Sequence, residues 1–226
     1  SRRNHNLVRL NCGAVSGDLI EAELFGCEKG PADSRESGRT GLFALADKST
    51  LFLDEIDEFP YHLQGKLLHA IDDKNYTPMG SSRPVSSDFR LIAATSRNLP
   101  ELVREGRFRE DLYYRLNVMS VTIPPLRERR DDIPFLVQNV LCSINKSAGT
   151  QTAISPEAIE RLKRHTWNGN IRELKNILEK LCILSDGIRI TEKDLLLLPE
   201  FAPGNAFPAD DYSSLIGQQE LPAILD

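Results

Sequence analysis

Two neighbouring carboxylates, Asp54 and Glu55, are the residues of this sequence best placed to do chemistry. They follow a short apolar run, Thr50 to Leu53, whose lack of alternation is typical of a strand in a parallel sheet covered on both faces. Ligands of open α/β sheets bind outside the carboxyl ends of the strands. Facing a nucleoside triphosphate, the first carboxylate can hold Mg²⁺ through water, and the second can orient or deprotonate the attacking water. The alternative is an acidic surface pair of the kind that follows any buried strand.

The composition is that of a soluble globular chain. It has 226 residues, of which 40% are hydrophobic and 27% charged, with a net charge of -5; the sequence pI is near 5.5. This acidic balance argues against a surface built mainly for nucleic acid. The apolar runs are too short for a membrane span, and the basic N-terminus is followed by no signal-like apolar segment. We therefore expect a cytoplasmic protein without membrane contact.

The cysteines are widely scattered and include no CxxC pair. Free thiols, mostly buried, are therefore expected rather than disulfides or a zinc site. The residues concerned are Cys12, Cys27, Cys142 and Cys182.

Strands and helices are expected to alternate as far as Pro125, which indicates a parallel sheet. The long segment 26–41 contains glycines, a proline and charges without periodicity, so it is expected to be an exposed functional or disordered loop. The expected strands are 7–11 (ending in Asn11), 50–53, 89–95 and 118–123, with an edge hairpin over 75–79 and 84–86. The expected helices are 16–25 (with Ser16 as N-cap), 41–46, 61–72, 99–105 and 108–116.

After Pro125 the pattern changes to helices alone. Residues 133–146 and 170–184 carry broad apolar stripes, Ser155–Pro156 opens a helix by N-cap and first-turn proline, and Thr191 caps another. We expect Trp167 to anchor this core rather than to contact a ligand. From Pro199 onward, Pro, Gly, Ala and Asn predict a linker.

These features together resemble the AAA+ central domain of bacterial enhancer-binding proteins, the activators of sigma-54 RNA polymerase. The resemblance covers residues 7–198 and rests on five motifs in the family's order: Leu24 to Gly30 (LFGCEKG), Thr50 to Ile56 (TLFLDEI), Phe108 to Leu116 (FREDLYYRL), Pro125 to Arg129 (PLRER) and Trp167 to Leu174 (WNGNIREL). It implies an α/β, parallel-sheet P-loop NTPase core, followed by a small all-helical lid. The implied domains are 1–125 for the core, 126–198 for the lid, and 199–226 for a linker towards a C-terminal DNA-binding domain.

The resemblance also implies roles for single residues, with ATP and Mg²⁺ as cofactors. Asp54 matches the Walker B metal ligand and Glu55 the group that activates water, while Asn11 matches the partner that restrains this glutamate. Thr95 and Ser96 fall on the first sensor, where the family usually ends in Asn. Arg172 matches the second sensor.

Arg109 and Arg115 match arginine fingers, which reach the nucleotide of a neighbouring subunit in a ring, expected to be a hexamer. Such a finger can accelerate phosphoryl transfer by roughly three to five powers of ten, and guanidinium suits the role because it stays charged and meets phosphate oxygens in pairs. Simpler alternatives exist for three of these assignments. The fingers can be ordinary surface ion pairs, Arg172 can pair with Glu173, and Asn11 can cap a turn.

The sequence departs from the family pattern in two places. Only ten residues precede Asn11, and they contain no Gly-Lys phosphate loop, so we expect this chain to be a fragment that binds ATP poorly by itself; a decayed gene is the alternative. The family's sigma-54 contact, Gly-Ala-Phe-Thr-Gly-Ala, is replaced by Gly30 to Arg35 (GPADSR), which lacks the aromatic anchor.

Two functional hypotheses follow. The first is the ATP-hydrolysing module of a sigma-54-type transcriptional activator that remodels the polymerase–promoter complex. The second is a DNA-binding regulator of the same family whose AAA+ domain only oligomerises or senses nucleotide, without engaging sigma-54. The loop Gly30 to Arg35 favours the second, whereas Asp54, Glu55 and the two arginines favour retained hydrolysis.

Overall fold

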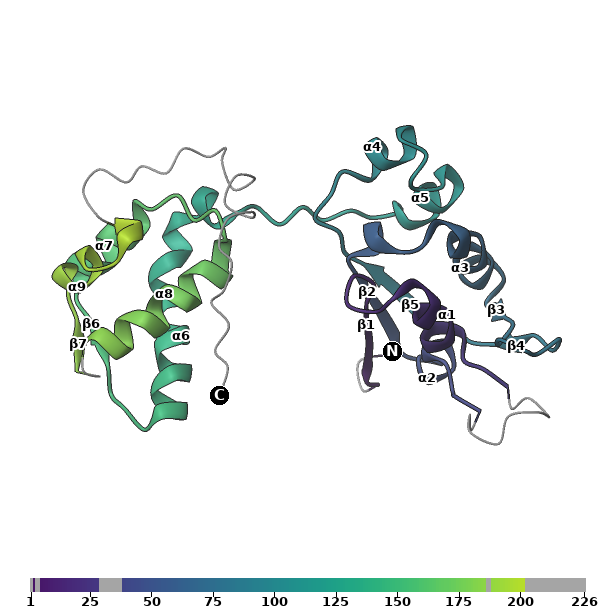
Figure 1. Ribbon diagram of the computed structural model, residues 1–226, viewed down its shortest axis with the longest axis horizontal. Helices are drawn as coiled ribbons and strands as arrows, with labels where there is room; N and C mark the ends of the chain where they lie inside the picture. The colour runs from purple at the N-terminus through teal and green to yellow at the C-terminus, as the bar shows by residue number, and fades with distance from the viewer. Residues whose placement is uncertain (1, 3–4, 29–37, 186–187, 202–226) are drawn as a thin grey trace, which may run out of the picture. The chain divides into compact units, whose positions relative to one another are not determined.

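The computed structural model describes residues 2, 5–28, 38–185 and 188–201 of the chain. The chain divides into two compact units, Ser1–Val121 and Thr122–Asp226, and each is described by itself (Figure 1).

A three-stranded parallel sheet forms the centre of the first unit. Strand β2 (Thr50–Asp54) lies between β1 (Leu7–Asn11) and β5 (Arg90–Ala93). Leu51 and Leu53 of β2 are fully buried, but Thr50, Phe52 and Asp54, which point to the other face, are only partly buried, and Ile92 beside Phe52 is 41% exposed. Burial therefore alternates along β2, and the prediction of a strand covered on both faces is wrong: among the described residues the sheet is covered on one face. The register pairs Asn11 of β1 with Asp54 of β2, so the polar ends of these two strands meet at one edge of the sheet.

The helices of this unit are largely those that the sequence predicts. They are α1 (Gly17–Phe25), α2 (Leu42–Leu45), α3 (Tyr61–Asp73), α4 (Leu99–Arg104) and α5 (Glu110–Leu116), with a 3-10 turn over Ile56–Glu58. In Figure 1, α1, α2 and α3 lie to one side of the strands. Ser16 does precede α1 in extended backbone, but its side chain makes no capping hydrogen bond. The core includes Ile20, Leu24 and Phe25 of α1 and Leu63 and Leu67 of α3.

A hairpin of β3 (Asn75–Tyr76) and β4 (Val85–Ser86) is confirmed as antiparallel. Cys27 pairs both with Arg39 and with Met79, so the two described ends of the 26–41 loop are tied to the hairpin. Gly26 has a φ of 77°, and a Cβ there would lie 2.6 Å from the carbonyl oxygen of Arg39. Glycine is therefore required at this crossing. The predicted sigma-54 contact at 30–35 lies outside the described residues.

The predicted strand over 118–123 is wrong. The segment forms no strand, and the side chains of Val118, Val121 and Ile123 are 80%, 82% and 75% exposed. Alternation of β-branched residues suits a strand, but a strand also needs a neighbour whose backbone can complete its hydrogen bonds. Among the described residues, β5 pairs only with β2, and this segment has no strand beside it.

The second unit is mainly helical and has its own core. Its helices are α6 (Ile133–Ala148), α7 (Pro156–Lys163), α8 (Asn170–Leu184) and α9 (Glu192–Leu196), with 3-10 turns over Leu126–Glu128, Arg130–Asp132 and Pro199–Phe201. Two short parallel strands that the sequence did not reveal, β6 (Ala153–Ile154) and β7 (Arg189–Ile190), pair the segment before α7 with the segment before α9. The caps behave as predicted, since Ser155 accepts a hydrogen bond from the Ala158 amide and Thr191 forms a capping box with Asp194.

Trp167 is the centre of this second core, as the sequence predicts. It is fully buried, and its indole Nε1–H donates to the carbonyl oxygen of Leu162 at 2.9 Å. The side chain of Asn170, which has a positive φ, accepts from the Leu126 amide at 2.7 Å. The turn between α7 and α8 thus ties the start of the unit to α8.

All four cysteines are free, as predicted, but only Cys12 is buried and Cys142 is exposed. Within the described residues, no helix has both the length and the apolar character needed to cross a membrane.

Candidate nucleotide-hydrolysis site

The carboxyl ends of β1 and β2 bring the first predicted site residues together. Asn11 and Asp54 are register partners, and the Cys12 amide donates to the Asp54 carbonyl oxygen at 2.9 Å, which continues the pairing one step further. Oδ1 of Asp54 accepts from the Glu55 amide at 3.1 Å. Glu55 itself has φ 52° and ψ 49°, a left-handed conformation that is uncommon for residues other than glycine and is concentrated at functional sites.

Glu55 and Asn11 both lie against Gly13. A Cβ at Gly13 would stand 2.2 Å from Oε2 of Glu55 and 3.5 Å from Oδ1 of Asn11. Oδ1 of Asn11 accepts from the amides of Gly13 and Ala14, at 2.8 and 3.0 Å. The turn-capping alternative for Asn11 therefore describes this structure, and the described contacts include no hydrogen bond between Asn11 and Glu55.

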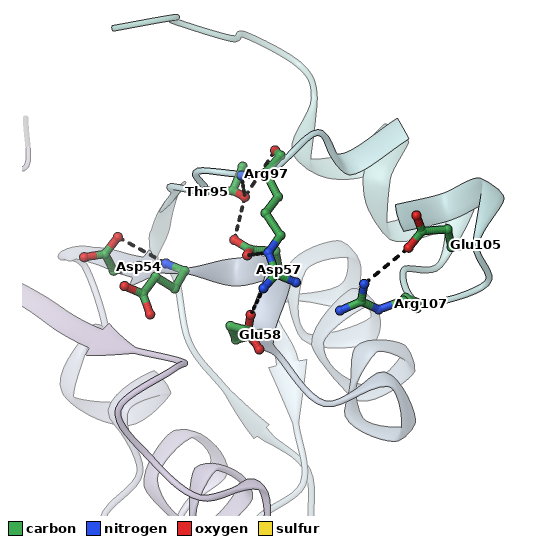
Figure 2. Close-up of polar contacts among 8 residues, drawn as sticks. Asp54, Asp57, Glu58, Thr95, Arg97, Glu105 and Arg107 are labelled. Atoms are coloured by element: carbon green, nitrogen blue, oxygen red, sulfur yellow. Dashed lines mark hydrogen bonds and ion pairs between the residues drawn. The ribbon is translucent and has the colours of Figure 1, made fainter. Parts of the chain in front are cut away.

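The end of β5 carries a polar cluster that sequence reasoning missed. The hydroxyl of Thr95 donates to Oδ1 of Asp57 at 2.5 Å, and the side chain of Asp57 is only 3% exposed. Arg97 lies 3.5 Å from Asp57 through Nε and 2.9 Å from Glu58 through Nη2. Figure 2 shows Arg97 reaching across from the β5 end to both acids, beside Asp54. The signal was present in the sequence as two further acids, Asp57 and Glu58, one residue beyond Glu55.

This cluster changes the prediction for the first sensor. Because the Thr95 hydroxyl is bonded to Asp57 and also accepts from the Arg97 amide at 3.0 Å, Thr95 holds the end of β5 in place. Ser96 is exposed at the next position. Of the two predicted residues, Ser96 is the one whose hydroxyl has no bond among the described contacts.

The pKa of Cys12 reflects the acidic side chains at this edge of the sheet. Burial, followed by the nearby charges of Asp54, Asp57 and Glu55, raises the pKa of its thiol to about 12. The thiol therefore stays protonated and acts here as a small apolar side chain rather than as a nucleophile.

The two predicted fingers form intrachain ion pairs on the surface. Nε and Nη2 of Arg109 donate to the two carboxylate oxygens of Asp111, at 3.0 and 2.7 Å, while Nε of Arg115 lies 2.5 Å from Oδ1 of Asp72. The arginine side chains are nevertheless 42% and 45% exposed. They are paired but not buried, so they retain access to solvent.

The ion pair between Arg109 and Asp111 also shifts the pKa of both side chains. Hydrogen bonds from Arg109 hold the pKa of Asp111 below its ordinary value, and the same bonds raise the pKa of Arg109. Both groups therefore remain charged at neutral pH.

Arg172 lies near the start of α8 in the second unit and is exposed. Its proposed alternative partner, Glu173, instead accepts from the Gly169 amide at 2.8 Å and lies 3.8 Å from Nδ1 of His165. The described contacts include no pair between Arg172 and Glu173.

A magnesium ion fits this site only with help from its substrate. Among the described residues, no three His, Cys, Asp or Glu side chains gather as a metal site. Mg²⁺ is commonly held by one or two carboxylates together with substrate phosphates and water, and Asp54 is partly exposed at the sheet edge, as that arrangement requires.

A parallel α/β unit with Asp-Glu at the end of its central strand, followed by a helical unit, is the arrangement of an AAA+ core and lid. Residues 1–122 match the family model of the Sigma-54 interaction domain, and residues 127–202 match that of the AAA+ ATPase lid domain. The chain therefore belongs to the sigma-54 interaction domain family of AAA+ proteins.

Individual relatives agree with this assignment. The DNA-binding transcriptional regulator NtrC of Azospirillum brasilense is 42% identical over 86% of this chain and 41% of its own length. The formate hydrogenlyase transcriptional activator FhlA of Escherichia coli K12 is 39% identical over 99% of this chain and 32% of its own length. An uncharacterised Pseudomonas protein is 45% identical over 86% of this chain and 66% of its own length. The chain thus spans about a third to two thirds of the length of these relatives.

Solved structures show the same fold. NtrX from Brucella abortus, crystallised with ATP, matches with a TM-score of 0.78 and 35% identity over 89% of this chain and 46% of its own. A second NtrX crystal structure matches with a TM-score of 0.80 and 36% identity, over 88% of this chain and 45% of its own.

Proposed function

We propose that this chain is the core of an ATP-hydrolysing module in a sigma-54-dependent transcriptional regulator, which uses ATP turnover to remodel the polymerase–promoter complex. The observation that carries the proposal is the meeting of Asn11, Asp54 and Glu55 at one sheet edge. Nucleotide binding is supported further by the likeness to NtrX, whose structures include complexes with ATP and ADP. A transcription regulator acts where the chromosome is, so the proposed location is the cytoplasm.

In this proposal Asp54 holds the metal through water and Glu55 orients the attacking water or takes its proton. Bound Mg²⁺ would supply neutralisation of the charge on the phosphates. The left-handed backbone at Glu55 directs its carboxylate towards Gly13 rather than along the strand. Because Asn11 and Glu55 share no bond among the described contacts, in this proposal Asn11 restrains the glutamate only after a rearrangement that brings the two side chains together.

The remaining predicted residues act from further away. Arg109 and Arg115 contribute positive charge to the nucleotide of a neighbouring subunit, which requires a ring assembly, proposed as a hexamer. Ser96 is the first-sensor residue, and Thr95 supports it through Asp57. Arg172 is the second sensor. The linker predicted to begin at residue 199 begins too early, because Pro199–Phe201 forms a 3-10 turn and Phe201 is buried in the second core. DNA contact is proposed to come from a C-terminal domain outside this chain.

The test is the ATPase rate of the complete gene product that contains residues 1–226, measured against protein concentration. A ring enzyme with fingers donated between subunits should gain specific activity as concentration rises. Glu55→Gln should retain ATP binding and lose turnover, whereas Glu101→Gln, the same change at an exposed acid of α4, should leave the rate intact. Turnover that survives Glu55→Gln would show that the catalytic assignment is wrong.

The second candidate is a regulator whose AAA+ domain only oligomerises or senses nucleotide. The sequence of Gly30 to Arg35, which lacks an aromatic side chain, favours it. It is distinguished by binding of nucleotide and ring formation without turnover at any protein concentration, together with no retention of sigma-54 polymerase by the ATP-bound protein.

A further inference from the structure

The two finger arginines share an arrangement of bonds that neither the family match nor the proposed function requires. Arg109 is held along the side of its guanidinium, through Nε and Nη2, by both oxygens of Asp111. Arg115 is held by Nε on Asp72. In both arginines Nε contacts the carboxylate. Nη1 of Arg109 and both terminal nitrogens of Arg115 make no bond among the described contacts.

The backbone of Arg109 is fixed as firmly as its side chain. Its amide donates to Oε1 of Gln64 at 2.8 Å, and Nε2 of Gln64 donates to the carbonyl oxygens of Phe59 and Arg107, at 3.1 and 3.3 Å. Gln64 is fully buried. The first finger is therefore anchored to α3 at its backbone, and Asp111 sets the direction of its side chain.

The second finger is anchored to the same helix from the other end of α5. Asp72 lies near the end of α3, and Arg115 lies in the last turn of α5. Both fingers thus depend on α3, one through Gln64 and one through Asp72.

We infer that Asp111 and Asp72 are positioning residues for the two arginines. Each carboxylate contacts its guanidinium through Nε, on the side nearest the arginine's backbone. This leaves Nη1 of Arg109 and both terminal nitrogens of Arg115 for the phosphate oxygens of a nucleotide bound to a second copy of this chain. This inference rests on the proposed function, because it needs fingers that act across a subunit boundary. A guanidinium has five N–H donors, so it bonds a carboxylate on one edge and a phosphate on another at the same time. An arginine already ordered by its carboxylate loses less side-chain freedom when it reaches the phosphate.

The chain offers a matched control for each acid. Glu110 and Asp73 are exposed neighbours of Asp111 and Asp72, and neither is bonded to a finger in the described contacts. Asp111→Asn and Asp72→Asn are therefore compared with Glu110→Gln and Asp73→Asn in the complete gene product. The readouts are kcat, the protein concentration at half-maximal specific activity, and the affinity for a fluorescent ATP analogue.

Displacement of a catalytic group by about 1 Å can cost roughly 100-fold in rate, so kcat is expected to fall roughly 10- to 100-fold in each Asn variant. Affinity for the ATP analogue, measured at a protein concentration too low for ring assembly, should stay at the parental value, because no neighbour's finger then meets the nucleotide. The two control variants should keep the parental kcat.

Mixing of subunits separates positioning from a structural defect. In rings that combine Asp111→Asn with Glu55→Gln, some Asp111→Asn subunits receive an intact finger from a Glu55→Gln neighbour, so activity should rise above that of either variant alone. The same holds for Asp72→Asn.

If the parent protein has ATPase activity, three results would overturn the inference. They are a kcat equal to that of the controls, a higher kcat (which would mean that the acids hold the fingers back), and a loss of kcat that mixing does not restore. A parent without ATPase activity at any concentration would instead remove the proposed function, and the inference with it.

Discussion

The buried amide of Gln64 gives the most direct test of how the first unit is held together. Its side chain makes three hydrogen bonds, to the carbonyl oxygens of Phe59 and Arg107 and from the amide of Arg109. Gln64→Met keeps the length of the side chain and removes all three. Each intramolecular hydrogen bond contributes about 1 kcal/mol net, so the unit should lose about 3 kcal/mol of stability, and more where the backbone groups stay shielded from water.

The assay is urea unfolding of the complete gene product, combined with hydrogen exchange of peptides that span 105–112. With a urea dependence of about 2 kcal/mol per molar, a loss of about 3 kcal/mol lowers the midpoint of this unit by about 1.5 M. The freed Arg109 amide should exchange at least about 5-fold faster, which corresponds to a loss of about 1 kcal/mol at one bond.

The matched control is Leu67→Met, a volume-conserving change at another fully buried position of α3, which should cost less than about 1.5 kcal/mol. A midpoint for Gln64→Met that is no lower than that of Leu67→Met would refute the reasoning. So would exchange in 105–112 that matches the parent.

The other predictions concern the close backbone contact at Gly26 and the partly buried His165. Gly26→Ala should destabilise the first unit by about 2 kcal/mol more than Gly80→Ala. Both glycines have positive φ, but only at Gly26 would the new Cβ meet backbone, 2.6 Å from Arg39 O, so equal midpoints in urea would argue against the crossing. Burial lowers the pKa of His165, so below about pH 6.5 the unfolded chain gains a proton that the folded state resists, and the stability of the second unit should fall as pH is lowered. Unfolding followed by the fluorescence of Trp167, the single tryptophan, should show a smaller loss between about pH 7.5 and about pH 5.5 in His165→Gln than in the exposed control His62→Gln.

Most strands and helices of both units could be predicted from the sequence, because short-range patterns encode them. Apolar runs gave β1, β2 and β5, apolar stripes gave α3, α6 and α8, and the cap at Ser155 located α7. The Asp-Glu pair and its place at the end of the central strand were predicted for the same reason, since both lie within one stretch of chain. The short strands β6 and β7 have too few residues to leave such a pattern.

Which partners these elements meet depended on contacts between distant parts of the chain. The apolar run at 118–123 has the composition of a strand, yet it has no neighbour to complete its hydrogen bonds among the described residues. Thr95 has the position of a sensor, yet its hydroxyl is taken by Asp57, a buried acid that the pairing of β2 with β5 brings next to it.

The sequence by itself therefore determined the family, the order of the elements and the acids at the sheet edge, since each follows from residue types at short spacing. The tertiary structure alone decided that Asp72 faces Arg115, that Gln64 holds the backbone of Arg109, and that Glu55 lies against Gly13. Hydrogen bonds and ion pairs form only within a few ångströms. The packing of α3 against α5 and of β1 against β2 sets those distances, and no local pattern records them.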